Sequence, residues 1–148
     1  MSRAYFKSKV DPDIRWYARL SSFTILVFCL IGAIWGFQVS GTSFNWIFPL
    51  IGIVESILIE VYVRYLGYTI TDTELQIGVK GLILKRVVIK DVDAIQQVRR
   101  NILNYSLSKR TISLIMSTGK EIVLAPQDQE LFIAQLARLN PLIEVKLP

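Results

Sequence analysis

Two apolar stretches in the first half of the chain restrict its fold more than any other feature. Residues 20–39 contain no charged side chain, and residues 46–65 form a second stretch of the same length. As α-helices that rise about 1.5 Å per residue, each would extend about 30 Å, the thickness of the hydrocarbon core of a bilayer. The connection between them is short and uncharged. We therefore expect an antiparallel hairpin of two transmembrane helices.

A cleaved signal peptide is the competing interpretation of the first stretch, because basic residues precede it. The stretch is longer than the apolar core of a signal peptide, it ends without a small-x-small cleavage site, and a second apolar stretch follows at once. We therefore expect a retained transmembrane helix.

The distribution of positive charge predicts the orientation of this hairpin. Residues 1–19 form a basic arm that we expect to be irregular, Arg64 ends the second stretch, and the connection has no Lys or Arg. Because basic residues favour the cytoplasmic side, both termini should be cytoplasmic. The basic residues of the arm are Arg3, Lys7, Lys9, Arg15 and Arg19.

Composition excludes several kinds of chemistry. The chain has no histidine and one cysteine, Cys29, so it cannot build a Cys/His zinc site, a disulfide framework, or a Cys-His or Ser-His catalytic pair by itself. We expect no catalytic residue, no metal and no cofactor. Nucleic-acid binding is not expected either, because only Tyr105 offers a stacking ring among the basic residues of the second half.

From Tyr68 onward the pattern changes to that of short strands followed by one helix, which defines an α+β fold class. Apolar and polar residues alternate along residues 74–79, as expected for a strand with one buried face. Further strands are expected at residues 82–89, 94–100, 111–116 and 121–125, and the strands should end at Pro126. Asp128 should cap a helix whose apolar stripe is Phe132, Ile133, Leu136 and Leu139, with Asn140-Pro141 as its end.

These residues resemble the bacterial pleckstrin-homology-like domains of small membrane-anchored proteins. The resemblance implies a strongly bent antiparallel sheet, nearly a barrel, capped by the C-terminal helix, and it implies neither a catalytic residue nor a settled ligand. The matching motifs are Tyr68-x-Ile70, Asp72-x-x-Leu75-x-Ile77, Ile89-x-x-Val92, Ser106-Leu107-Ser108-x-Arg110-x-x-x-Leu114 with Gly119, and Ala125-Pro126-x-Asp128-x-x-x-Phe132-Ile133-x-x-Leu136-x-x-x-Asn140-Pro141.

Eukaryotic relatives of this fold often bind phosphoinositides through basic residues in the first hairpin. The turn that we assign to this hairpin is Thr71-Asp72-Thr73, which is acidic.

The resemblance and the apolar stretches together predict three parts: a basic cytoplasmic arm at 1–19, a transmembrane hairpin at 20–66 and a PH-like domain at 67–148. The expected function is that of an interaction module at the inner leaflet of the bacterial cytoplasmic membrane, with a protein partner or a second copy. The alternative is an accessory subunit of a larger membrane complex.

Glu55 is the residue on which the alternative depends. It lies near the middle of the second apolar stretch, at the depth that we assign to Cys29 and Leu30 of the first. A charged carboxylate there is costly unless it is paired, protonated or hydrated. Three interpretations remain open: contact with another subunit, a neutral hydrogen-bonded acid, and an ion-responsive group.

Other polar and small residues of the hairpin favour structural roles. Glu60 and Arg64 have the i,i+4 spacing of a helical ion pair. Small residues at i,i+4 on each stretch allow close helix packing, either within the chain or between two copies. These small residues are Gly32, Gly36, Gly52 and Ser56.

Basic residues in the second half suggest either a surface for anionic lipid head groups or an ordinary solvated strand face. They are Lys80, Lys85, Arg86, Lys90, Arg99, Arg100, Lys109 and Arg110.

Overall fold

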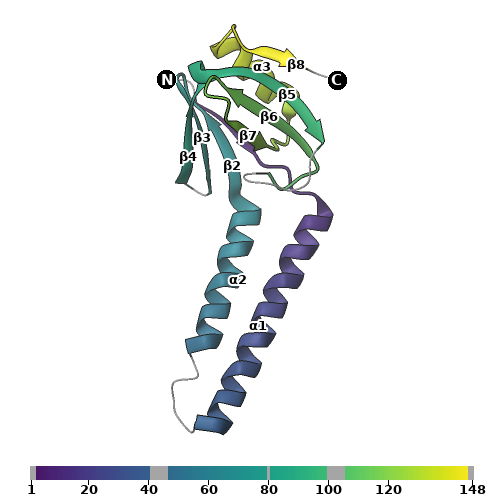
Figure 1. The fold of residues 1–148 in the computed structure, drawn as a ribbon, viewed down its shortest axis with the longest axis vertical. Coiled ribbons are helices and arrows are strands. Elements are labelled where there is room, and N and C mark those ends of the chain that lie inside the picture. The colour runs from purple at the N-terminus through teal and green to yellow at the C-terminus, as the bar shows by residue number, and fades with distance from the viewer. Residues whose placement is uncertain (1–2, 41–46, 80, 100–105, 147–148) are drawn as a thin grey trace. The chain divides into compact units, whose positions relative to one another are not determined.

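The computed structural model describes residues 3–40, 47–79, 81–99 and 106–146. The chain divides into two compact units (Figure 1). Residues Pro12–Arg64 form the helical unit, and Met1–Asp11 together with Tyr65–Pro148 form the sheet unit. The sheet unit is therefore assembled from both sides of the helical unit in the sequence.

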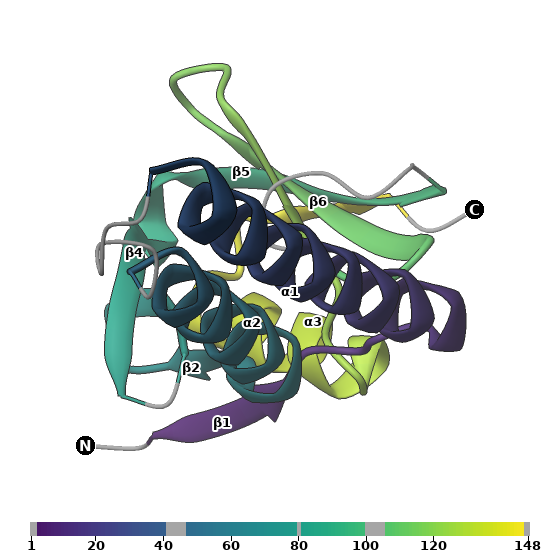
Figure 2. The ribbon, with the colours of Figure 1, turned by 90° about the horizontal axis from the view of Figure 1, so that it is seen from below.

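The helical unit consists of α1 (Pro12–Ser40) and α2 (Ile47–Tyr65), which lie side by side (Figures 1 and 2). Ser56 Oγ donates to the carbonyl oxygen of Ser22 across the pair at 3.3 Å. Within the described residues, one helix is long and apolar enough to cross a membrane, and it is α1 over Pro12–Trp35. Helix α2 carries three charged side chains in its 19 residues, Glu55, Glu60 and Arg64, and a crossing by both helices stays a prediction.

The described part of the sheet unit contains two four-stranded sheets. The first sheet has the order β1-β2-β3-β4 and the second has the order β7-β6-β5-β8. Neighbouring strands are antiparallel except β5 and β8, which are parallel. The strands are β1 (Ala4–Lys7), β2 (Leu66–Ile70), β3 (Glu74–Val79), β4 (Leu82–Val88), β5 (Val92–Arg99), β6 (Arg110–Met116), β7 (Glu121–Leu124) and β8 (Glu144–Lys146).

Helix α3 (Gln129–Leu139) supplies the aromatic centre of the core. The ring of Phe132 meets Phe6 of β1 edge-on at 5.2 Å and Tyr68 of β2 at 5.9 Å between ring centroids. Asn140, which ends the helix, is buried and donates through Nδ2 to the carbonyl oxygens of Ile89 at 3.1 Å and Val92 at 3.3 Å. These two residues lie at the 3₁₀ turn η2 (Ile89–Asp91) between the sheets, so Asn140 fixes α3 to that corner.

The α+β fold class is confirmed, and the alternation along β3 is matched by alternating burial. Three expectations are wrong. The arm is not irregular throughout, because Ala4–Lys7 pairs with β2. The strands do not end at Pro126, since β8 follows α3. The side chain of Asp128 makes no capping hydrogen bond, and its backbone carbonyl instead accepts from Phe132 N–H at 3.0 Å.

The helical unit is inserted between two adjacent strands of one sheet. β1 precedes α1, β2 follows α2 without an intervening residue, and the two strands pair from Ala4↔Ile70 to Lys7↔Gly67. The first strand pair of the domain is thus joined by the helices, and the turn Thr71-Asp72-Thr73 joins the second pair, β2 and β3.

After β1 the backbone joins the first sheet to the second. Ser8 N–H donates to the carbonyl oxygen of Leu66 at 3.0 Å, and Lys9 N–H donates to that of Ala125, just after β7, at 2.6 Å. Asp11 N–H donates to the carbonyl oxygen of Leu107 at 2.9 Å. The chain therefore leaves for α1 at the same end of the sheet unit to which it returns from α2, and we call this the helix-proximal end.

A buried polar contact strengthens this junction. The Tyr68 hydroxyl accepts from Ala125 N–H at 3.1 Å and shares a hydrogen bond with the Ser8 hydroxyl, also at 3.1 Å. Tyr68 and Ala125 are fully buried, so without this contact the Tyr68 hydroxyl and the Ala125 N–H could not form hydrogen bonds with water instead.

Replacing Tyr68 by Phe should destabilise the sheet unit by about 1–3 kcal/mol, because the buried N–H of Ala125 would lose its acceptor. Hydrogen–deuterium exchange of the detergent-solubilised full chain should show faster exchange in β1, β2 and β7. Tyr5→Phe is the matched control, since Tyr5 is 63% exposed. Equal exchange in Tyr68→Phe and the unaltered chain would contradict the stabilising role.

Candidate functional site

Asp11 holds the helix-proximal end of the second sheet. Its carboxylate accepts from the Ser108 hydroxyl at 2.9 Å and from Lys109 N–H at 2.8 Å, across 97 and 98 positions of sequence. Burial opposes ionisation of this group, but the two hydrogen bonds and the charges of Lys9 and Lys109 outweigh it and lower the pKa of Asp11. Asp11 therefore acts as an anionic clasp directly before the first residue of α1.

A hollow of about 820 Å³ lies beside the first turn of α3. A pair of glutamines spans it: Gln97 Nε2 donates to Gln129 Oε1 at 3.2 Å, and Gln129 Nε2 donates to the carbonyl oxygen of Arg110 at 3.0 Å. The lining carries both positive and negative side chains, so the hollow offers polar contacts and is not a site for ligands of only one charge. The lining residues are Lys9, Gln97, Arg110, Gln127, Asp128, Gln129, Glu130, Leu131, Ile133 and Ala134.

In the described part of the chain, no group of three or more His, Cys, Asp or Glu residues is arranged to hold a metal ion.

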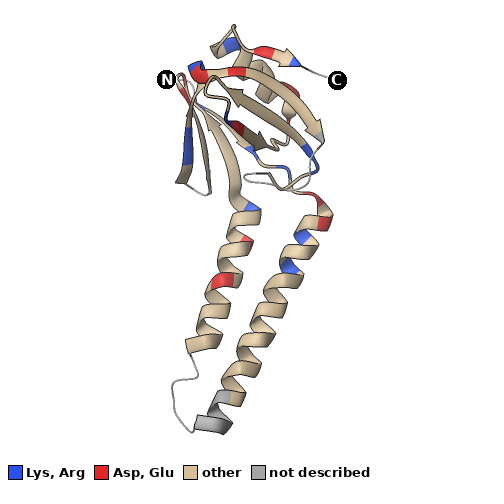
Figure 3. Ribbon diagram, viewed as in Figure 1, with Lys and Arg blue, Asp and Glu red and all other residues tan. Residues whose placement is uncertain are grey.

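The predicted basic residues are divided between the two sheets (Figure 3). Lys85 and Arg86 lie in β4 and Lys90 lies in η2, whereas Arg110 begins β6 and Lys109 directly precedes it. Lys80, Arg100 and the side chain of Arg99 lie outside the described residues. Lys9 was not among the residues predicted for the lipid surface, but it lines the hollow together with Arg110. Only the fold places these two cations together.

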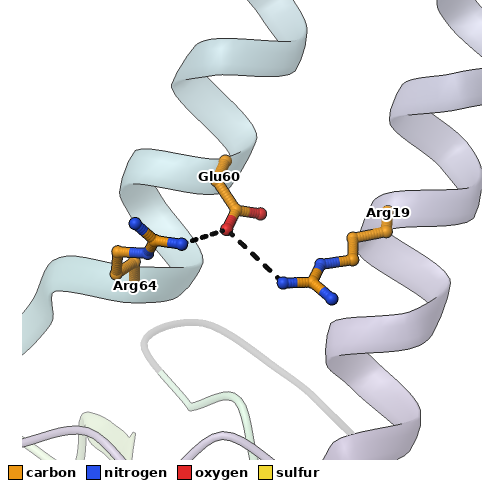
Figure 4. A network of polar contacts seen from close by, with 3 residues as sticks. All are labelled: Arg19, Glu60 and Arg64. Atoms are coloured by element: carbon orange, nitrogen blue, oxygen red, sulfur yellow. Dashed lines mark hydrogen bonds and ion pairs between the residues drawn. The ribbon is translucent and has the colours of Figure 1, made fainter.

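Glu60 forms a small ionic network in the helical unit (Figure 4). Arg64 Nη2 lies 3.2 Å from Glu60 Oε1, with the predicted i,i+4 spacing. Arg19 of α1 approaches the same oxygen at 3.9 Å, a contact that spacing along one helix does not reveal. Since these side chains are substantially exposed, the network guides helix register more than it adds stability.

Glu55 lies exposed on α2. The sequence predicted that it would lie level with Cys29 and Leu30, and this prediction is wrong. A Cβ atom added to Gly52 would lie 2.9 Å from the Cys29 sulfur, while Ser56 bonds to the carbonyl of Ser22. Glu55 therefore lies level with the α1 residues between these two contacts. The expected register assumed a symmetric turn, whereas these two contacts show α2 shifted along α1 from that position.

The small residues do not act as one packing motif. Gly52 and Ser56 face α1, and Gly52 is buried there. A Cβ atom added to Gly32 would meet no atom within 4 Å, so Gly32 does not bring the two helices together. The surroundings of Gly36 are not among those that the structure describes.

The arrangement of β2 to β7 followed by α3 defines a small domain of two sheets and one helix, with a polar hollow beside the first turn of that helix. Residues 66–140 match the family model of the bacterial PH domain. The chain belongs to this family, whose domains are typically non-enzymatic modules that bind proteins or lipids. No curated protein matches the chain at a significant level. β1 and β8 both lie outside the matched residues.

The Asp11 clasp predicts an acid-sensitive contact. Because its pKa is lowered on folding, Asp11 contributes stability fully above the usual aspartate pKa, near 3.9, and loses it as the pH falls through the lower folded value. Asp11→Ala should lower the protection of the amides around Lys109 from exchange at neutral pH, with protection measured against the intrinsic rate at each pH. The unaltered chain should show the same loss of protection only in acid. Asp128→Asn is the control, because Asp128 makes no side-chain cap. Unchanged exchange in Asp11→Ala would contradict the clasp.

Proposed function

We propose that this chain is a membrane-anchored bacterial PH-domain module. In this proposal α1 and α2 both cross the cytoplasmic membrane, and the sheet unit binds a protein or lipid partner at the inner leaflet. Membership of the bacterial PH domain family supports the binding role. The anchoring role is supported by the helices.

The observation that carries the proposal is the apolar surface of both helices. No residue in the most apolar part of α1 is buried, and α2 also exposes a series of large apolar side chains. A surface of this kind in water would aggregate, whereas a bilayer removes it from water. Exposed members of this surface include Phe23, Phe28, Ile31, Ile34 and Trp35 of α1 and Leu50, Val54, Ile57 and Leu58 of α2.

The path of the chain supports a hairpin with both termini on one side. β1 and β2 pair with each other although the helical unit separates them in sequence. The chain must therefore leave and re-enter the sheet unit on the same side of the membrane. Positive charges at Arg15, Arg19 and Arg64, near the sheet-unit ends of the helices, favour the cytoplasmic side.

Reporter fusions in a bacterial host test this topology. Alkaline phosphatase, which is active only outside the cytoplasm, should be inactive when fused to the C-terminus and active when inserted into the connection at residues 41–46. The full chain should also remain in the membrane pellet after alkaline carbonate extraction. An active C-terminal fusion, or release of the chain by carbonate, would contradict the proposal.

The alternative function, an accessory subunit of a larger membrane complex, is supported by one observation. Glu55 is exposed on α2, while Gly52 and Ser56 of the same helix face α1. Within hydrocarbon, an exposed carboxylate costs several kcal/mol unless a partner or water reaches it. A polar group on a neighbouring membrane protein would lower that cost.

The accessory-subunit function predicts that a second membrane protein copurifies with the chain in mild detergent and is lost on Glu55→Leu. Glu60→Gln is the matched control, because the ion pairs of Glu60 lie within the helical unit. Purification of the unaltered chain as a lone monomer or homodimer would exclude this alternative and leave the anchored module.

A further inference from the structure

The β3–β4 hairpin carries an apolar run at the edge of the first sheet. Leu82, Ile83 and Leu84 open β4 and are 66%, 40% and 41% exposed. β4 is the last strand in the sheet order, so its outer edge has no neighbouring strand in the described sheet. Three consecutive exposed apolar side chains on an edge strand are a hazard for a protein unless something covers them.

The local backbone makes this run a poor template for another strand. The pairing of β3 with β4 shifts between Ile77 and Gly78, which leaves Leu84 as an extra residue opposite no partner. Gly78 allows this irregularity, because a Cβ atom there would collide with the carbonyl oxygen of Leu82. Since bulges twist an edge away from regular pairing, strand addition by a partner or a second copy is disfavoured at this point.

Strand register places the run at the helix-proximal end. Val79 lies opposite Leu66 on one side and opposite Leu82 on the other. Leu66 directly follows Tyr65, the last residue of α2. Because adjacent strands lie about 4.8 Å apart, Leu82 is roughly 10 Å from the residue at which the chain returns from α2.

The charge around the run suits a lipid surface. Residues 82–90 include Lys85, Arg86 and Lys90 and contain no Asp or Glu. An apolar tip followed by basic residues is the pattern of segments that enter the interface of a membrane with anionic lipids.

We propose that Leu82, Ile83 and Leu84 insert into the interface of the bilayer that holds α1 and α2, with anionic phospholipid head groups next to Lys85 and Arg86. This inference rests on the proposed membrane anchoring. It assigns the β3–β4 hairpin as a lipid-binding element that acts in addition to the helices.

Single nitroxide labels on the full chain test the proposal. Cys29→Ser removes the native thiol, and a label is then attached to Leu82→Cys, Leu84→Cys, Val88→Cys or Phe28→Cys in vesicles of phosphatidylethanolamine and phosphatidylglycerol. The measurement compares collisions of each label with oxygen, which concentrates in lipid, and with a water-soluble nickel chelate. Val88 is the matched control, because it is 42% exposed at the other end of β4, roughly 20 Å from Leu82.

Labels at positions 82 and 84 should favour oxygen over the nickel chelate several-fold more than the label at position 88 does. If the label at Phe28 reports lipid while those at 82, 84 and 88 all report water, the hairpin inference is overturned and the anchoring stands. If the label at Phe28 reports water, the proposed anchoring itself fails. Strong spin–spin broadening at position 82 would overturn the inference in favour of contact between two copies.

Discussion

The hydrogen bonds made by the backbone between Lys7 and Asp11 are the contacts on which the sheet unit depends. Ser8 N–H reaches β2, Lys9 N–H reaches the residue after β7, and Asp11 N–H reaches Leu107 ahead of β6. These three contacts join the two sheets at one end, where the Tyr68 hydroxyl adds a buried polar contact. A segment that the chain makes before either helix thus completes a domain whose remaining strands come after both.

This topology changes the covalent connection between the helical unit and the sheet unit. Had the helices simply preceded a complete domain, a single connection would have joined the two units. Here the chain passes from Asp11 directly to Pro12 and from Tyr65 directly to Leu66, so two connections join the helical unit to the sheet unit. The Asp11 clasp and the β3–β4 tip lie at that same helix-proximal end. In our account, this end is the part of the domain that meets lipid.

Sequence patterns predicted the parts of the fold that are local in sequence. Alternation defined β3, and the apolar spacing that includes Phe132 and Leu136 defined the buried face of α3. β1 was missed because its four residues carry no clear alternation and its partner strand lies some 60 positions away. β8 was missed because all three of its residues are exposed. The contact of Arg19 with Glu60 depends on the register between two helices, which neither helix encodes alone.

β1 belongs to the same sheet as β2, and the helical unit is inserted between them in sequence. Tyr5 and Thr69 are register partners, at a spacing that a disulfide can bridge. In a Cys29→Ser background, Tyr5→Cys with Thr69→Cys should crosslink on mild oxidation of the full chain. Tyr5→Cys with Gln76→Cys should not, because β2 lies between those positions. Failure of the first pair to crosslink, or equal crosslinking of both pairs, would contradict the account.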